Sequence, residues 1–157
     1  IASFIANSDQ ETLLVIKHHP MDRGYHNYTD AIRQFAIAYN APDRILYIHD
    51  QHLPTLLDHT AGVVLINSTV GLSALHHNAP VKVCGKAIFD MQGLTFQGEL
   101  NAFWQGAKQH RINSTLYQSF LSYLVGKTQI NGSFYKKLMS VQNKSGMVWS
   151  DDLNKAA

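Results

Sequence analysis

The sequence is poor in cysteine and in charge and has no long apolar run, and each shortage excludes a class of protein. Its one cysteine, Cys84, can form no disulfide within the chain, and its place in the apolar run 81–84 predicts a small buried thiol. No stretch approaches the roughly 18 consecutive apolar residues that a membrane-spanning helix requires. Charged residues make up 15% of the 157 positions, and the 13 basic side chains form no stripe. We therefore expect no nucleic-acid partner.

The start of the chain also lacks an initiator methionine and the basic-then-apolar pattern of a signal peptide. We expect that an N-terminal part of a longer polypeptide, including an acceptor domain, is absent from this chain. The length suits one hydrophobic core. Residues 1–135 are predicted to form that domain, and residues 136–157 to form a C-terminal helical tail.

Short apolar runs alternate with segments of helical periodicity. The run 12–17 is rich in β-branched residues, which predicts a strand buried on both faces, and 28–39 is predicted to be a helix capped by Asn27. Further strands are predicted over 45–48, 63–66 and 81–84, with helices from Pro54 and around Leu72, and later over 102–106 and 114–127. This alternation favours βαβ units. The fold class is therefore α/β, with a Rossmann-like parallel sheet flanked by helices.

Polar residues concentrate where the predicted strands end, which is where open parallel sheets bind ligands. They are Lys17, His18, His19 and Pro20 after the first strand, His49 and Asp50 after the second, and Asn67, Ser68 and Thr69 after the third. Asp50 and Asp90 are interpreted either as carboxylates that orient a sugar or ribose hydroxyl or as turn-forming loop residues. The remaining aspartates considered, Asp22, Asp30, Asp43 and Asp58, are interpreted as loop, cap or solvated-face residues.

The segment 67–71 has the clearest chemistry. The hydroxyls of Ser68 and Thr69 and the backbone N–H groups at the start of a helix converge as donors for a phosphate, and the helix dipole favours an anion there. The alternative is that these hydroxyls only cap the helix. The segment lacks the glycines and lysine of a P-loop.

His19 and Pro20 are open to two interpretations. The imidazole can donate to a phosphate or to a carbonyl of a base while the proline fixes the path of the chain, or His19 can be an ordinary loop residue. Nine histidines raise the question of a metal, but His18-His19 and His76-His77 are adjacent pairs rather than ligand spacing, and no HExxH pattern or Cys-His cluster occurs. We expect no metal and no cofactor.

Several motifs in order resemble one known family, the bacterial capsular polysaccharide biosynthesis and export proteins. The motifs are Val15 to Pro20, Tyr47 to Asp50 with Leu53-Pro54, Asn67 to Leu72, Pro80 to Lys82, Gly93 to Thr95 with Gln97-Gly98, and Thr128-Gln129 with Asn131 to Ser133. They cover residues 12 to 135, and the ordered series is more specific than any single motif.

The resemblance implies the nucleotide-binding half of a GT-B-type glycosyltransferase. The resemblance also implies the substrates: members of this family use CMP-activated Kdo (3-deoxy-D-manno-octulosonic acid) and build a Kdo linker on lysophosphatidylglycerol. His19 and Pro20 would contact CMP, and Ser68 and Thr69 its phosphate. Lys17, Asn67, Gly71 and the possible donor contacts His49, Asp50, Asp90 and Gln97 would lie nearby. The implied partners are the nucleotide sugar, a lipid acceptor and other capsule-assembly proteins, and the implied location is the cytoplasm, peripheral to the inner membrane.

Two other functions fit the same residues. The half-domain could use another donor, CMP-sialic acid or a UDP-sugar, since no pocket residue in the sequence decides between them. It could instead be a noncatalytic module that docks on a capsule-assembly protein, with Trp104, Tyr135 and Trp149 exposed at the interface. In either enzyme interpretation we expect the isolated chain to bind donor weakly and to lack turnover.

Overall fold

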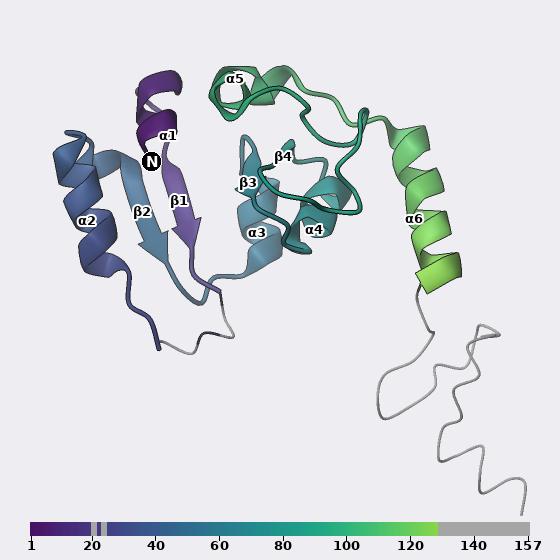
Figure 1. Ribbon diagram of the computed structural model, residues 1–157, viewed down its shortest axis with the longest axis horizontal. Coiled ribbons are helices and arrows are strands. Elements are labelled where there is room, and N and C mark those ends of the chain that lie inside the picture. The colour runs from purple at the N-terminus through teal and green to yellow at the C-terminus, as the bar shows by residue number, and fades with distance from the viewer. Residues whose placement is uncertain (20–21, 23–24, 129–157) are drawn as a thin grey trace, which may run out of the picture. The chain divides into compact units, whose positions relative to one another are not determined.

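The computed structural model describes residues 1–19, 22 and 25–128 (Figure 1). The chain divides into two compact units, Ile1–Ser114 and Thr115–Ala157. In the described part of the second unit the chain forms a helix, α6 (Ser114–Thr128), in which Tyr117 is buried. The predicted tail, residues 136–157, lies outside the described residues.

The first unit alternates helices and strands, as the sequence predicts. Its elements are α1 (Ala2–Asn7), β1 (Leu14–Lys17), α2 (Thr29–Ala38), a 3-10 turn (Pro42–Arg44), β2 (Ile45–Ile48), α3 (Leu53–Asp58), β3 (Val63–Leu65), α4 (Val70–His76), β4 (Val81–Val83), α5 (Leu100–Gly106) and a second 3-10 turn (Ala107–Gln109). The side chain of Asn27 accepts the N–H of Thr29 at 2.9 Å at the start of α2. Pro54 lies in the first turn of α3, where its missing N–H costs nothing.

The strands pair in parallel within each βαβ unit. β1 pairs with β2 from Leu14 opposite Ile45 onward, and β3 pairs with β4 from Val63 opposite Val81 onward. The prediction of helix-connected parallel strands is confirmed. In the described residues, however, the pairs form two separate two-stranded sheets instead of one continuous sheet. Within each pair, the two strands are connected by one helix, α2 or α4. Strands of three or four residues offer few backbone N–H and C=O groups for pairing with a strand of the other βαβ unit.

The prediction that the first strand is buried on both faces is wrong. Val15 is 42% exposed, and Leu46, directly opposite it on β2, is 50% exposed. The alternate side chains Ile16 and Tyr47 face α2 across a shared cavity. Successive side chains of a strand point to opposite faces, and the single crossover helix between β1 and β2 covers only one of them.

The most deeply buried part of the first unit lies around β4. Val81 and Val83 are 0% and 4% exposed. Leu75 from α4 is fully buried, as are Phe89 and Leu94 from the chain that follows β4. This second βαβ unit therefore has a closed apolar core, which holds the start of α4 in place.

Two side chains differ from expectation. Cys84 is exposed, because β4 ends at Val83 and the chain leaves the core there. Trp104 is half-buried rather than exposed: its indole N–H donates to Ser3 at 2.8 Å, and its ring packs edge-on against Phe4 at 5.3 Å. Trp104 is therefore part of the contact between α1 and α5, whereas Tyr135 and Trp149 lie outside the described residues.

Gly71 lies where α4 packs closely against Phe89. A Cβ atom at this position would collide with the ring of Phe89 and would lie 3.1 Å from Leu65 Cδ2. Phe89 is itself enclosed by the core, so its ring cannot move aside. We predict that Gly71→Ala lowers the free energy of unfolding by about 1–3 kcal/mol, measured by chemical denaturation.

The matched control is Gly126→Ala in α6, where an added Cβ would meet nothing within 4 Å. That change is expected to be neutral or to stabilise by up to about 1 kcal/mol, since alanine is the better helix former. If both variants were as stable as the wild type, the close packing of α4 on Phe89 would be disproved.

Candidate functional site

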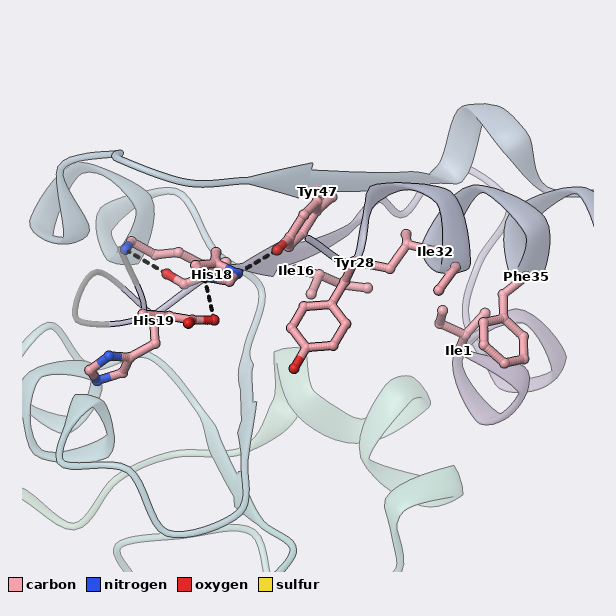
Figure 2. A pocket seen from close by; sticks show the side chains of 11 residues that line it. Ile1, Ile16, His18, His19, Tyr28, Ile32, Phe35 and Tyr47 are labelled. Carbon is pink, nitrogen blue, oxygen red and sulfur yellow. Dashed lines mark hydrogen bonds and ion pairs between the residues drawn. The ribbon is translucent and has the colours of Figure 1, made fainter. Parts of the chain in front are cut away.

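A cavity of about 490 Å³ lies between α2 and the β1–β2 pair, at the carboxyl end of β1 (Figure 2). Its walls are mostly apolar along α2 and polar near the end of β1. The apolar lining comes from Ile1, Ile16, Ala31, Ile32 and Phe35, and the remaining lining residues are Lys17, His18, His19, Asp22, Tyr28 and Tyr47. The cavity therefore has one end suited to rings or apolar groups and another suited to an anion or a hydroxyl.

His18 is the buried polar residue at this end. Its Nδ1 forms a hydrogen bond with the hydroxyl of Tyr47, the penultimate residue of β2 (Figure 2). Its Nε2 lies 2.9 Å from Oδ2 of Asp22, although the N–H bond does not point straight along that line. The ring of His49 stacks on the other side at 4.8 Å. The side chain of His18 is only 7% exposed, so these contacts fix its orientation.

Asp22 joins two histidines. Its Oδ1 lies 3.2 Å from Nδ1 of the exposed His26, and its Oδ2 faces His18. Burial acts to raise the pKa of the Asp22 carboxyl, but the hydrogen bond and charge of His26 and the charge of His18 outweigh it and bring the pKa below its ordinary value. Asp22 is therefore a carboxylate at neutral pH, an acceptor for both rings.

His19 lies at the cavity but is exposed, and Figure 2 shows its ring turned away from that of His18. Lys17, half-buried in β1, places its ammonium 3.4 Å from the carbonyl of His18. The structure thus brings two of the predicted residues, Lys17 and His19, to one opening. Pro20, predicted beside them, lies outside the described residues.

The predicted residues after β2 are less closely tied to the cavity. His49 is exposed on its outer side and packs against His18 and, edge-on at 4.8 Å, against Tyr47. Asp50 is exposed. Neither residue is among those that line the cavity. His49 therefore supports the buried histidine instead of facing the space beside α2.

The segment 67–71 lies on the second βαβ unit and does not line the cavity. Ser68 Oγ accepts the N–H of Val70 at 3.2 Å, which is a capping role. Asn67 and Thr69 are exposed at the start of α4. Gly71 is buried against Phe89, so its lack of a side chain is explained by packing. The phosphate-binding role of this segment stays a prediction.

Asp90 and Gln97 bind each other and a buried threonine. The hydroxyl of Thr95, which is 1% exposed, donates to Asp90 at 2.7 Å, and the amide of Gln97 donates to the Thr95 hydroxyl at 2.8 Å. The same amide lies 3.3 Å from Asp90. Both predicted donor contacts therefore already have partners, and their hydrogen bonds hold together the chain after β4.

Sequence reasoning missed the set His18, Asp22 and Tyr47. Asp22 was interpreted as a loop, cap or solvated-face residue, yet it contacts His18. Asp58 was interpreted in the same way, and it binds His77 at 2.6 Å. The sequence does show the spacing of four residues between His18 and Asp22, and it shows that the apolar run ends in polar residues. It does not show the partner on β2, because that partner depends on the strand register.

Two features are absent from the described part of the chain, a cluster of metal ligands and a membrane-spanning helix. There, no three His, Cys, Asp or Glu side chains are placed to hold a metal ion. Among the same residues, no helix combines the length and the apolar character needed to cross a membrane.

The lowered pKa of Asp22 has a consequence for stability. A carboxyl whose pKa is lower in the folded state stabilises the protein above its unfolded pKa, and this contribution is lost as the pH falls through the folded pKa. We predict that Asp22→Asn melts below the wild type at pH 5–6, and that the gap closes as the pH falls from about 4 toward 2. Thermal melts followed by circular dichroism check this. A gap of the same size at pH 2 and pH 6 would contradict the ion pair.

Comparison with known proteins identifies the family. The family described as "Capsule polysaccharide biosynthesis protein" matches residues 1–135. The chain is 47% identical over 133 residues to the capsule polysaccharide export protein KpsS of Escherichia coli, a match that covers 85% of this chain and 34% of that protein. It is 40% identical over 146 residues to the capsule polysaccharide modification protein LipB of Neisseria meningitidis serogroup B, covering 92% of this chain and 34% of the relative.

The chain thus spans about a third of the length of these relatives. No solved structure gives a significant match. The family match extends over the first unit and through the described part of the second. The family resemblance predicted from the motifs is therefore confirmed, and the chain belongs to the capsule polysaccharide biosynthesis protein family.

Proposed function

We propose that this chain is the donor-binding part of a capsule glycosyltransferase of the GT-B type. In this proposal the chain binds CMP-Kdo, and the whole protein transfers Kdo to a lysophosphatidylglycerol-type lipid at the cytoplasmic side of the inner membrane. Family membership supports the link to capsule polysaccharide, since the relatives are named for its export and modification. Two parallel βαβ units support nucleotide binding, because their strand ends are the usual ligand sites of such folds.

The placement of His19 is the observation that carries the proposal. Its exposed imidazole lies at the carboxyl end of β1 and at the opening of a cavity of about 490 Å³. The ammonium of Lys17 comes from the strand end directly before it. A cation and an imidazole together suit a phosphate, and the cavity beside them has aromatic walls at Tyr28 and Tyr47 suited to a ring.

The second half of the proposed site is the start of α4. Thr69 is exposed there, and Ser68, although it accepts the N–H of Val70, still has a hydroxyl proton to donate. Neutral donors at this position would stabilise the charge that develops on the departing CMP phosphate. Asn67 offers an additional exposed amide.

The chemistry of sugar transfer requires more than these donors. An acceptor must be bound, and its hydroxyl must lose a proton to a base. Because the chain spans about a third of its relatives, we assign acceptor binding and proton transfer to the remainder of the protein. The chain alone then binds donor weakly and does not turn it over.

The noncatalytic alternative loses part of its support. It relied on Trp104 as an exposed interface residue, and the indole instead packs between α1 and α5. The other donors, CMP-sialic acid and UDP-sugars, are distinguished from CMP-Kdo by experiment.

We predict that calorimetric titration of the 157-residue chain gives CMP binding that is stronger than UDP binding. His19→Ala and the double variant Ser68→Ala/Thr69→Ala should each weaken CMP affinity about tenfold or more, the cost of one or two hydrogen bonds to a charged group. Incubation with CMP-Kdo and lysophosphatidylglycerol should give no transfer product with the chain alone.

The control is His59→Ala, which removes an exposed histidine at the end of α3 and should leave CMP affinity unchanged. Equal affinity for CMP and UDP would contradict the cytidine preference. Unchanged CMP binding in His19→Ala would remove His19 from the site, and transfer by the isolated chain would contradict the assignment of catalysis to the rest of the protein.

A further inference from the structure

We propose that His18, the residue before the predicted nucleotide contact, is a positioning residue that holds His19 in place through Asp22 and Tyr47. The inference rests on the proposed function, since it assigns His18 a part in nucleotide binding. It differs from the interpretation of the sequence, in which His18 had no role of its own.

The protons of the cluster can be assigned from its chemistry. An ionised Asp22 can only accept, so the facing Nε2 of His18 carries a proton. In the neutral ring Nδ1 is then the acceptor, and the hydroxyl of Tyr47 donates to it. The ring thus has a hydrogen bond at Nδ1 and an ion-pair contact at Nε2, with groups from two different segments of the chain.

Backbone hydrogen bonds extend this hold to His19. The N–H of His18 donates to the carbonyl of Ile48 at 2.8 Å, which ties His18 to the end of β2. The N–H of Asp22 donates to the carbonyl of His19 at 3.1 Å. His19 therefore lies between two anchored residues, and the contact of Asp22 with His18 closes the turn that contains it.

The rings of His18 and His19 point in different directions (Figure 2). His18 is buried and His19 is exposed, as expected for successive residues at the end of a strand (Figure 2). If the Asp22 side chain were lost, the contact of Asp22 with His18 would be lost too, and the backbone at His19 would be less firmly held. A ligand would then have to order His19 on binding, which lowers affinity without removing any group that touches the ligand.

A second histidine–aspartate pair provides a matched control. His77 and Asp58 lie 2.6 Å apart, with 22% and 58% of their side chains exposed, between the ends of α4 and α3. Asp58→Ala removes the same kind of contact away from the β1–β2 cavity. A general effect of losing such a pair would appear in both variants.

The experiment compares the 157-residue chain with its variants Asp22→Ala, Tyr47→Phe and Asp58→Ala, well below the melting temperature of each. CMP affinity is measured by calorimetry, the backbone order parameter of His19 by ¹⁵N relaxation, and the His18 tautomer by imidazole ¹⁵N shifts. Asp22→Ala and Tyr47→Phe should weaken CMP binding about tenfold, and Asp22→Ala should lower the order parameter of His19 and change the tautomer balance of His18. Asp58→Ala should match the wild type in all three measurements.

The outcomes separate this inference from the proposed function. If the wild type binds CMP and Asp22→Ala binds it equally well, His18 and Asp22 do not position the site and the inference is wrong. If the wild type binds no CMP, the proposed function fails, and the order parameter of His19 decides the inference alone. A fall confined to Asp22→Ala then supports the anchoring, and an unchanged value overturns it.

Discussion

The parallel pairing of β1 with β2 is the contact on which the candidate site depends. Its register sets Ile16 opposite Tyr47 and Lys17 opposite Ile48, and the ladder is extended by the N–H of His18 to Ile48. Shifting this register by one residue would turn Tyr47 to the other face and separate its hydroxyl from His18. A short strand pair thus determines which of the two histidines is buried and which is exposed.

Much of the fold follows from local sequence. The alternation of β-branched runs with helical periodicity predicted the order of strands and helices, and the proline at the start of α3 was predicted by residue. Asn27 accepts an N–H at the start of α2, although the N-cap residue is Tyr28. The exposure of Val15 and Leu46 was not predicted, because a continuous apolar run looks the same whether one face or two are covered. The division into two strand pairs also escaped prediction, since no local pattern records which edges meet.

The candidate site was predictable where chemistry follows directly from a strand end. Lys17 and His19, which that rule selects, line one cavity, and their role in binding stays a prediction. The partner of Asp90 and Gln97 was not predictable, because Thr95 is buried and appears in the sequence as an ordinary polar residue. The rule also could not find Tyr47 as the partner of His18, because side chains 29 residues apart meet only through strand pairing.

The two histidine–aspartate pairs differ in burial, and burial decides whether such a pair can hold a neighbouring residue in place. In the pair His77–Asp58 the carboxylate is 58% exposed, so water competes for both groups and the pair has little hold on its surroundings. Around His18 the ring is enclosed by Tyr47, Asp22 and His49, and each nitrogen has one available partner. The buried ring cannot turn without breaking the hydrogen bond between Nδ1 and Tyr47 and the ion-pair contact between Nε2 and Asp22, and that cost keeps the neighbouring residue oriented. The enclosed ring of His18 therefore gives the exposed His19 a fixed point beside it in the chain.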